Sequence, residues 1–346
     1  MRTLSGADAF ATCTVPNTLT NGQATDATQV MANFNSLLAC INTTVTQVQT
    51  APQGRLTLTS NTPVMTADAT AQSTVYYTPY VGNQLPIAGA MYSFSQLSYS
   101  LSTSAHLAGN LYDVFAYYVS GAAALCTGPA WSSGTARAAA LSLSNGIWSN
   151  QSSLTCTVSG GGSTTSLAAN NATYLGTFYA TANGQTGMAF KPTAASGGTN
   201  NVLGVYNGYN RLRIIAKSRD SSGFWTYSST TWRSANNSTG NRVSFVDGLA
   251  QSSIAGTTQV LLQGTSAVPT IGMNLDSTSA TPAQAATMAW LSSGVHDGNG
   301  IVSDNWSPVI GFHFIQAMES CQGGPCQFTA VGGAYPYQGL IVNLDM

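Results

Sequence analysis

The sequence has very few charged residues. Of its 346 residues, 10 are Lys or Arg and 11 are Asp or Glu, so 6% are charged, against about 25% in an ordinary soluble domain. The formal net charge is −1, and Lys and Arg form no extended patch. This excludes the electrostatic footprint of a nucleic-acid-binding protein and a polybasic membrane anchor. Because so neutral a surface gives little repulsion between copies, we expect a protein that packs against others.

Long apolar runs are also missing. No run approaches the roughly 18 residues that predict a transmembrane helix, and residues 1–8 have no apolar segment of the kind that a secretory signal needs. We therefore predict no membrane partner and no nucleic-acid partner. Disorder is excluded, because 15 Tyr, 11 Phe and 6 Trp provide ample material for a packed core.

Six cysteines allow 15 full pairings, and the sequence alone does not choose among them. Closeness in the sequence favours two disulfides, Cys126 with Cys156 and Cys321 with Cys326. The second would span a turn that contains Gly and Pro. Free buried thiols remain the alternative. A metal site is disfavoured, because the three histidines lie in unrelated segments. The remaining pair would be Cys13 with Cys40.

One helix is predicted over about residues 26–51. Asp26 and Gln29 have the spacing of a capping box, and apolar residues then recur at steps of four, three, four and seven, which is a heptad seam. A lone helix of this composition is marginal in water. We predict a short parallel coiled coil of three identical chains, with packing on the chain's own body as the alternative. The trimerisation residues are Val30, Phe34, Leu37, Ile41 and Val48.

From Arg55 onward the hydrophobic period becomes two. Short strand-like runs alternate with turn signals such as Asp247-Gly248 and Asp297-Gly298-Asn299-Gly300, which predicts a mainly β protein with an antiparallel sandwich or barrel body. Thr281-Pro282 has the chemistry of a helix start and predicts one short helix. The expected organisation is an attachment segment with the helix (1–53), a β-rich body (54–280) and a C-terminal β region (281–346), which belongs to the same body or forms a tip.

The sequence contains, in order and at sensible spacing, the motifs Arg55-Leu56-Thr57-Leu58-Thr59-Ser60, Tyr76-Tyr77-Thr78-Pro79-Tyr80, Tyr112-Asp113-Val114-Phe115, Tyr174-Leu175-Gly176-Thr177-Phe178 and Gly272-Met273-Asn274-Leu275-Asp276. These motifs resemble a recurrent body domain of bacteriophage virion proteins, the tail fibres and minor structural proteins. The resemblance covers most of residues 18–280, whereas residues 281–346 depart from it. It implies a homotrimeric component on the virion exterior that contacts other tail, baseplate or capsid proteins.

Catalytic signals are weak. Glycoside hydrolysis uses two carboxylates about 5–10 Å apart, but several candidates stand in turn contexts, where an Asp side chain satisfies the turn's own backbone. No Gly-x-Ser-x-Gly elbow provides a nucleophile. We predict no enzyme, no cofactor and no metal. The carboxylates considered are Asp113, Asp220, Asp247, Asp276, Asp297, Asp304 and Glu319.

Binding residues are easier to find. Neutral aromatics and amides suit a sugar-binding surface, and they also suit a β core; Tyr206, Tyr209, Arg211 and Arg213 are the candidates for a glycan site or a subunit interface. The two arginines begin a basic cluster on one face of a strand, which needs a carboxylate partner, either Asp220 or one from a neighbouring chain. The alternative function is therefore a lectin-like module that recognises a host surface glycan.

Overall fold

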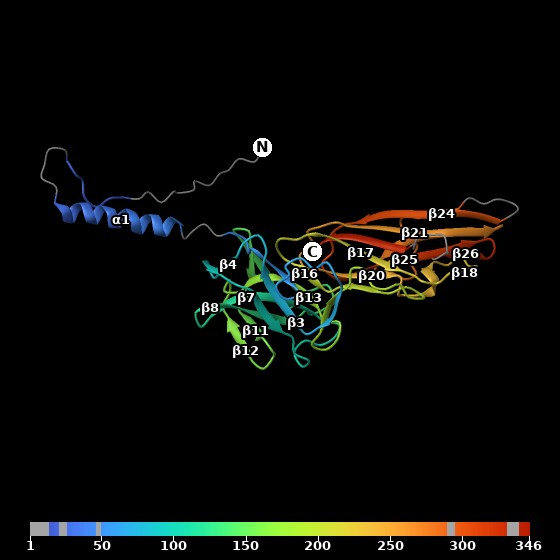
Figure 1. Ribbon diagram of the computed structural model, residues 1–346, viewed down its shortest axis with the longest axis horizontal. Coiled ribbons are helices and arrows are strands. Elements are labelled where there is room, and N and C mark those ends of the chain that lie inside the picture. The colour runs from blue at the N-terminus through green and yellow to red at the C-terminus, as the bar shows by residue number, and fades with distance from the viewer. Residues whose placement is uncertain (1–13, 21–25, 46–49, 289–294, 331–338) are drawn as a thin grey trace.

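A computed structural model describes residues 14–20, 26–45, 50–288, 295–330 and 339–346. One α-helix, α1 (Ala27–Val45), precedes a body of β-strands. The strands pair antiparallel except for β15 with β20, which run parallel. The prediction of a mainly β chain with one N-terminal helix is confirmed. Figure 1 shows an elongated molecule, with α1 at one end, a first lobe in the middle and a longer second lobe at the other end.

The first lobe contains a small sheet, a large sheet and a hairpin. The small sheet has the order β1 (Gly54–Thr57), β3 (Thr74–Pro79), β6 (Leu97–Ser100). The large sheet has the order β12 (Thr164–Leu167), β11 (Leu154–Val158), β8 (Ala122–Ala130), β7 (Leu111–Val119), β13 (Thr173–Tyr179), β10 (Ile147–Asn150), β9 (Leu141–Ser144), with β16 (Val205–Asn207) also on β13. The hairpin is β4 (Gln84–Ile87) with β5 (Ala90–Ser93).

The second lobe contains two further sheets. One has the order β2 (Ala69–Gln72), β14 (Thr186–Met188), β15 (Asn201–Leu203), β20 (Arg242–Asp247), β25 (Gly311–Gln322), β22 (Val268–Leu275), β23 (Ala285–Thr287), with β19 (Arg233–Ser234) on β25 and a 3-10 turn, η1 (Ala235–Asn237), following it. The other has the order β17 (Arg213–Arg219), β27 (Gly339–Asp345), β21 (Ile254–Thr265), β26 (Cys326–Thr329), β18 (Trp225–Tyr227), with β24 (Val295–Trp306) on β21.

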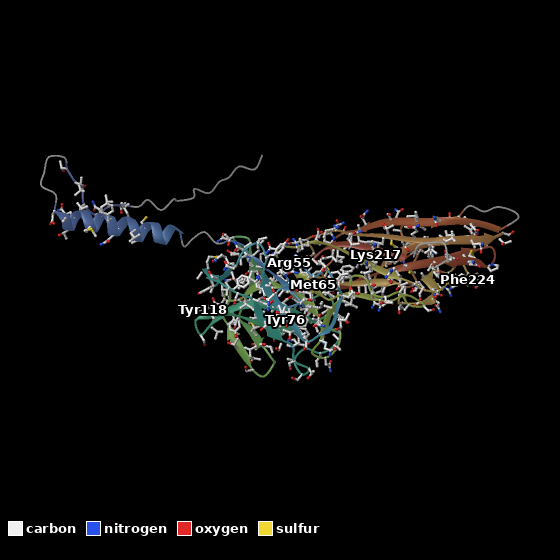
Figure 2. The ribbon with its side chains drawn as sticks, in the orientation of Figure 1. Arg55, Met65, Tyr76, Tyr118, Lys217 and Phe224 are labelled. Carbon is white, nitrogen blue, oxygen red and sulfur yellow. A yellow bond between two sulfur atoms is a disulfide. The ribbon has the colours of Figure 1, made fainter. Side chains whose placement is uncertain are left out.

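One hydrophobic cluster runs through both lobes. It joins Tyr77 and Phe178 of the first lobe to Phe245 and Phe328 of the second, all at most 1% exposed. The two lobes therefore share a core. Arg55, at the boundary between them in Figure 2, is 5% exposed and donates from Nη2 to the Met346 carbonyl at 3.2 Å.

The C-terminal residues belong to the same sheets as the residues before them. β25 lies between β20 and β22, and β27 lies between β17 and β21. β22 and β23, which lie on either side of residue 280, pair with each other. The described residues from 281 onward thus complete the second lobe.

Two local predictions are wrong. Asp297-Gly298-Asn299-Gly300 is not a turn, because it lies inside β24, which pairs with β21 along its whole length. A Cβ on Gly300 would come within 2.7 Å of Leu262 Cδ1, so this glycine serves close packing between strands. Thr281-Pro282 starts no helix. Pro282 instead packs over Gly272 of β22, where an added Cβ would lie 2.5 Å from Pro282 Cγ, and β23 follows.

Candidate functional site

The N-terminal helix begins as the sequence predicts, and its described part extends to Val45. The Thr28 amide donates to Asp26 Oδ1 at 2.9 Å, and these hydrogen bonds to Thr28 lower the pKa of Asp26. The Gln29 amide donates to the Asp26 carbonyl at 3.0 Å. The described helix has 19 residues and spans about 28 Å at 1.5 Å per residue. Val48 and the side chain of Ile41 lie outside the described residues.

The helix lies apart from the β body (Figure 1), and residues 14–17 run along one side of it. The backbone amide of Asn17 donates to Asn33 Oδ1 at 2.9 Å, and Asn33 Nδ2 donates to the Asn17 carbonyl at 2.8 Å. Ser36 Oγ donates to the Thr14 carbonyl at 2.9 Å. The chain's own leading segment therefore covers the face that carries Asn33 and Ser36.

The opposite side of the helix is apolar and open. Met31, Phe34 and Leu38 are 56%, 63% and 58% exposed, and their spacing of three and four residues places them on one stripe. Val30 and Leu37 of the predicted seam are half-buried at its edge. The exposed stripe shares Phe34 with the predicted seam and is otherwise displaced by one residue, because the leading segment covers the side next to Val30 and Leu37.

A second feature is a hollow of about 570 Å³ where the β9–β10 hairpin meets the residues that follow β16. Tyr209 and Trp148 lie together in it, since the Trp148 amide donates to the Tyr209 hydroxyl at 2.6 Å. Burial raises the pKa of Tyr209, so the phenol stays neutral. Arg211, Gln251 and Asp345 provide the polar part of the wall. We call this feature the Trp148 hollow.

The four predicted binding residues divide into three roles. Tyr209 and Arg211 line the Trp148 hollow. Tyr206 is 1% exposed and lies behind Arg211, accepting from its Nη1 at 2.6 Å; burial raises the pKa of Tyr206 to about 12. Arg213 forms an exposed ion pair with Asp345 at 3.5 Å, so it reaches the hollow only through that partner.

Sequence reasoning missed Trp148. A signal was available, because Asn145-Gly146 is a strong hairpin turn and both residues have positive φ, 51° and 78°. That turn sets Leu143 directly opposite Trp148 on the β9–β10 hairpin, and both residues line the hollow.

Asp220 is not the partner of the basic cluster. Its Oδ2 accepts from Asn236 Nδ2 and Asn241 Nδ2, each at 2.9 Å, and its Oδ1 accepts from the backbone amides of Gly197 and Ser222. Burial raises the pKa of Asp220, but these hydrogen bonds outweigh it and lower the pKa overall. The residue organises loops, as its turn context indicated.

Three other carboxylates from the catalytic list also have structural partners. Asp113 pairs with Arg137 at 2.8 Å. Glu319, fully buried, pairs with Arg233 at 2.7 Å. Asp276 pairs with His313 at 2.6 Å. Within the described ranges, no group of three or more His, Cys, Asp or Glu is placed to hold a metal, and no described helix is long and apolar enough to cross a membrane.

Two disulfides link the pairs favoured by sequence neighbourhood. Cys126 in β8 is bonded to Cys156 in β11, and Cys321 in β25 is bonded to Cys326 in β26. Cys13 of the third expected pair lies outside the described residues. None of the described cysteines is a free thiol.

Comparison with known proteins identifies no family. No family model matches the chain, and no curated protein matches it. Among solved structures, a tryptic core variant of Cry1Da from Bacillus thuringiensis aligns over 88% of this chain and 54% of its own length, so the chain spans about half of that protein. The identity is 10% and the TM-score 0.17, a likeness too low to carry an argument about fold or function.

Proposed function

We propose that this chain is a structural protein of a bacteriophage virion, a fibre-like or decoration component that α1 assembles into a homotrimer on the particle exterior. The observation that carries the proposal is the open apolar stripe of Met31, Phe34 and Leu38 on a helix that lies apart from its own body. The motif resemblance to virion body domains supports the same assignment, as does the nearly charge-free composition.

The physical argument concerns the cost of leaving that stripe in water. Burying a large apolar side chain is worth about 1.5–3 kcal/mol, and a lone helix of this length is marginal in water. Three copies that bring their stripes together hide this surface. No described Glu or Lys flanks the stripe to fix a dimer. Three β bodies held on one helical bundle would also bind a surface more tightly than one body does, because the first contact raises the effective concentration of the other two.

Replacing Phe34 with Glu is expected to dissociate the trimer. At 35.7 kDa per chain, three copies give 3 × 35.7 = 107 kDa, and light scattering on an eluting peak should show this mass for the wild type. The F34E variant should elute at the mass of one chain, because a carboxylate in each helix would meet two others in an apolar seam.

The matched control is Gln29→Glu, which adds the same charge at an exposed position on the opposite side of the helix; Q29E should keep the mass of 107 kDa. A wild-type chain that elutes as a monomer would overturn the trimer. A trimeric F34E variant would show that the body trimerises without α1.

The second candidate function is a receptor-binding, lectin-like module, and the Trp148 hollow favours it. Two aromatic residues, Trp148 and Tyr209, lie together where the Trp148 backbone amide donates to the Tyr209 hydroxyl, and guanidinium, amide and carboxylate groups stand around them, so the hollow offers aromatic surface and hydrogen-bonding partners to a sugar. This candidate is compatible with a place on a virion, because a surface protein of a phage meets the host envelope first.

A glycan array probes this function directly. We expect the wild type to bind a subset of surface glycans, and Trp148→Ala to weaken that binding at least about tenfold, as loss of an aromatic anchor does. Phe224→Ala is the control, since Phe224 is 64% exposed and lies far from the hollow in the second lobe (Figure 2). Absence of glycan binding by the wild type, or W148A binding equal to that of F224A, would remove the lectin candidate.

A further inference from the structure

A second hollow, of about 560 Å³, lies on the face of the β15–β20–β25 part of the second lobe. Val202, Ser244 and Phe314 form one row across these three strands, because Val202 is in register with Ser244 and Ser244 with Phe314. Tyr179 and Asp276 close the sides. We call this feature the Arg242 hollow. It shares no lining residue with the Trp148 hollow.

Aromatic side chains make up much of its wall. The rings of Tyr179 and Phe312 are stacked, with centroids 3.7 Å apart and planes 6° from parallel. Phe314 lies two residues along β25 from Phe312, so both project from the same side of the strand. All three are half-buried. Fixed aromatic surfaces of this kind bind the apolar faces of flat or ring-shaped ligands.

Arg242 gives the hollow its charge. Its guanidinium carbon lies 5.0 Å from the centroid of the Phe314 ring, and its buried Nε has no hydrogen-bond partner. Among the described residues, no carboxylate lies within ion-pair distance of Arg242. Because Nε is buried, an anion in the hollow would meet the two Nη groups, and a planar anion can accept two parallel hydrogen bonds from a guanidinium.

The one carboxylate in the wall does not cancel this charge. Asp276 Oδ2 lies 2.6 Å from His313 Nδ1, and His313 Nε2 lies 2.9 Å from the Ile310 carbonyl. Because both ring nitrogens face acceptors, both carry protons and the imidazole is positive. Burial lowers the pKa of His313, but the hydrogen bond to Asp276 and its charge raise it overall. The Asp276–His313 pair is thus neutral, and Arg242 leaves the hollow with a positive charge.

We propose that the Arg242 hollow binds a carboxylate-bearing sugar residue, such as a uronic acid within an oligosaccharide. Arg242 pairs with the carboxylate, and the aromatic wall packs against the C–H face of the sugar ring. Asn200, oriented by a 3.0 Å hydrogen bond from Ser244 Oγ, is placed to bind a hydroxyl. The site depends neither on the trimer nor on the Trp148 hollow.

The test compares two probes of equal length on the full-length protein, a tetrasaccharide with alternating glucuronate residues and a neutral glucose tetrasaccharide. Titration followed by protein NMR should give a dissociation constant at least about tenfold lower for the acidic probe, since hydrogen bonds between charged groups are roughly twice as strong as those between neutral ones. Arg242→Gln should bring the two constants close together. Arg213→Gln, which removes an exposed arginine elsewhere, should leave the ratio unchanged.

Arg242→Lys covers the case in which R242Q fails to fold. It keeps the charge and removes the planar fork, so most of the preference should be lost. Equal affinity of the wild type for both probes would overturn the proposal, as would an unchanged ratio in a folded R242Q or R242K variant. Inorganic phosphate that displaces the acidic probe at equal concentration would reduce the hollow to a general anion site and exclude specific sugar recognition.

Discussion

Replacing Asp113 with alanine is expected to lower the free energy of unfolding by about 3–5 kcal/mol, the usual cost of breaking a buried ion pair. Asp113 Oδ2 accepts from Arg137 Nε at 2.8 Å, and its Oδ1 accepts from Thr177 Oγ1 at 2.7 Å. The side chains of Asp113 and Arg137 are only 5% and 10% exposed. The alanine variant would leave the guanidinium buried without its counter-charge.

Arg137 connects the Asp113 site to the second lobe, so the substitution should affect both lobes. Its Nη2 donates to the carbonyl of Gly248, just after β20 of the second lobe, while Asp113 is in β7 of the first lobe. The guanidinium carbon lies 4.5 Å from the centroid of the Trp131 ring. Loss of Asp113 therefore loosens a contact between lobes that share one core, and we expect one cooperative unfolding transition at lower denaturant concentration.

Asp345→Ala is the matched control for this measurement. It breaks the Arg213–Asp345 pair, whose side chains are 50% and 39% exposed, and should cost no more than about 1 kcal/mol. Guanidinium chloride unfolding followed by circular dichroism measures both variants. If D113A and D345A lost similar amounts, the buried pair would contribute no more than a surface pair does.

The strands were the most predictable part of the fold. Runs such as 112–118 and 174–179 became β7 and β13, and 243–246 became part of β20. A half-buried strand alternates polar and apolar residues, and a fully buried strand is largely apolar, so both leave a pattern in the sequence. Asp247-Gly248 ended β20 as its turn chemistry indicates. The Asp-Gly pair in β24 led to a wrong turn prediction. A glycine there serves packing between strands, and the local sequence does not reveal which strand will lie opposite.

The candidate sites were less predictable for a related reason. Tyr209 and Arg211 were found because aromatic and basic residues cluster there in sequence. Trp148 lies 61 positions before Tyr209, and Arg242 meets Phe314 only through the register of β20 with β25. Such juxtapositions are fixed by long-range strand pairing, which composition and spacing do not encode. On α1 the exposed stripe is offset by one residue from the predicted seam, because the leading segment covers the side next to Val30 and Leu37; the seam itself stays a prediction.

Removing the Cys126–Cys156 disulfide is expected to cost about 3–4 kcal/mol. The two cysteines are 30 residues apart, and closing a loop of that length in the unfolded chain is worth about 3.7 kcal/mol in the chain-entropy estimate. Both are fully buried in a small cluster with Phe115 and Tyr174, so alanine substitutions also leave a cavity. The double variant C126A/C156A should therefore unfold at clearly lower guanidinium chloride concentration.

The Cys321–Cys326 disulfide provides the comparison, because it closes a loop with a separation of only 5 residues. The same estimate gives about 2 kcal/mol for it, and C321A/C326A should lose correspondingly less. Reducing the wild type with dithiothreitol removes the cross-links without making cavities, so it should cost the loop-closure part of the two losses and not the cavity part. A short-loop variant that lost as much as the long-loop variant would show that native packing at the cysteines, and not restriction of the unfolded chain, sets their contribution.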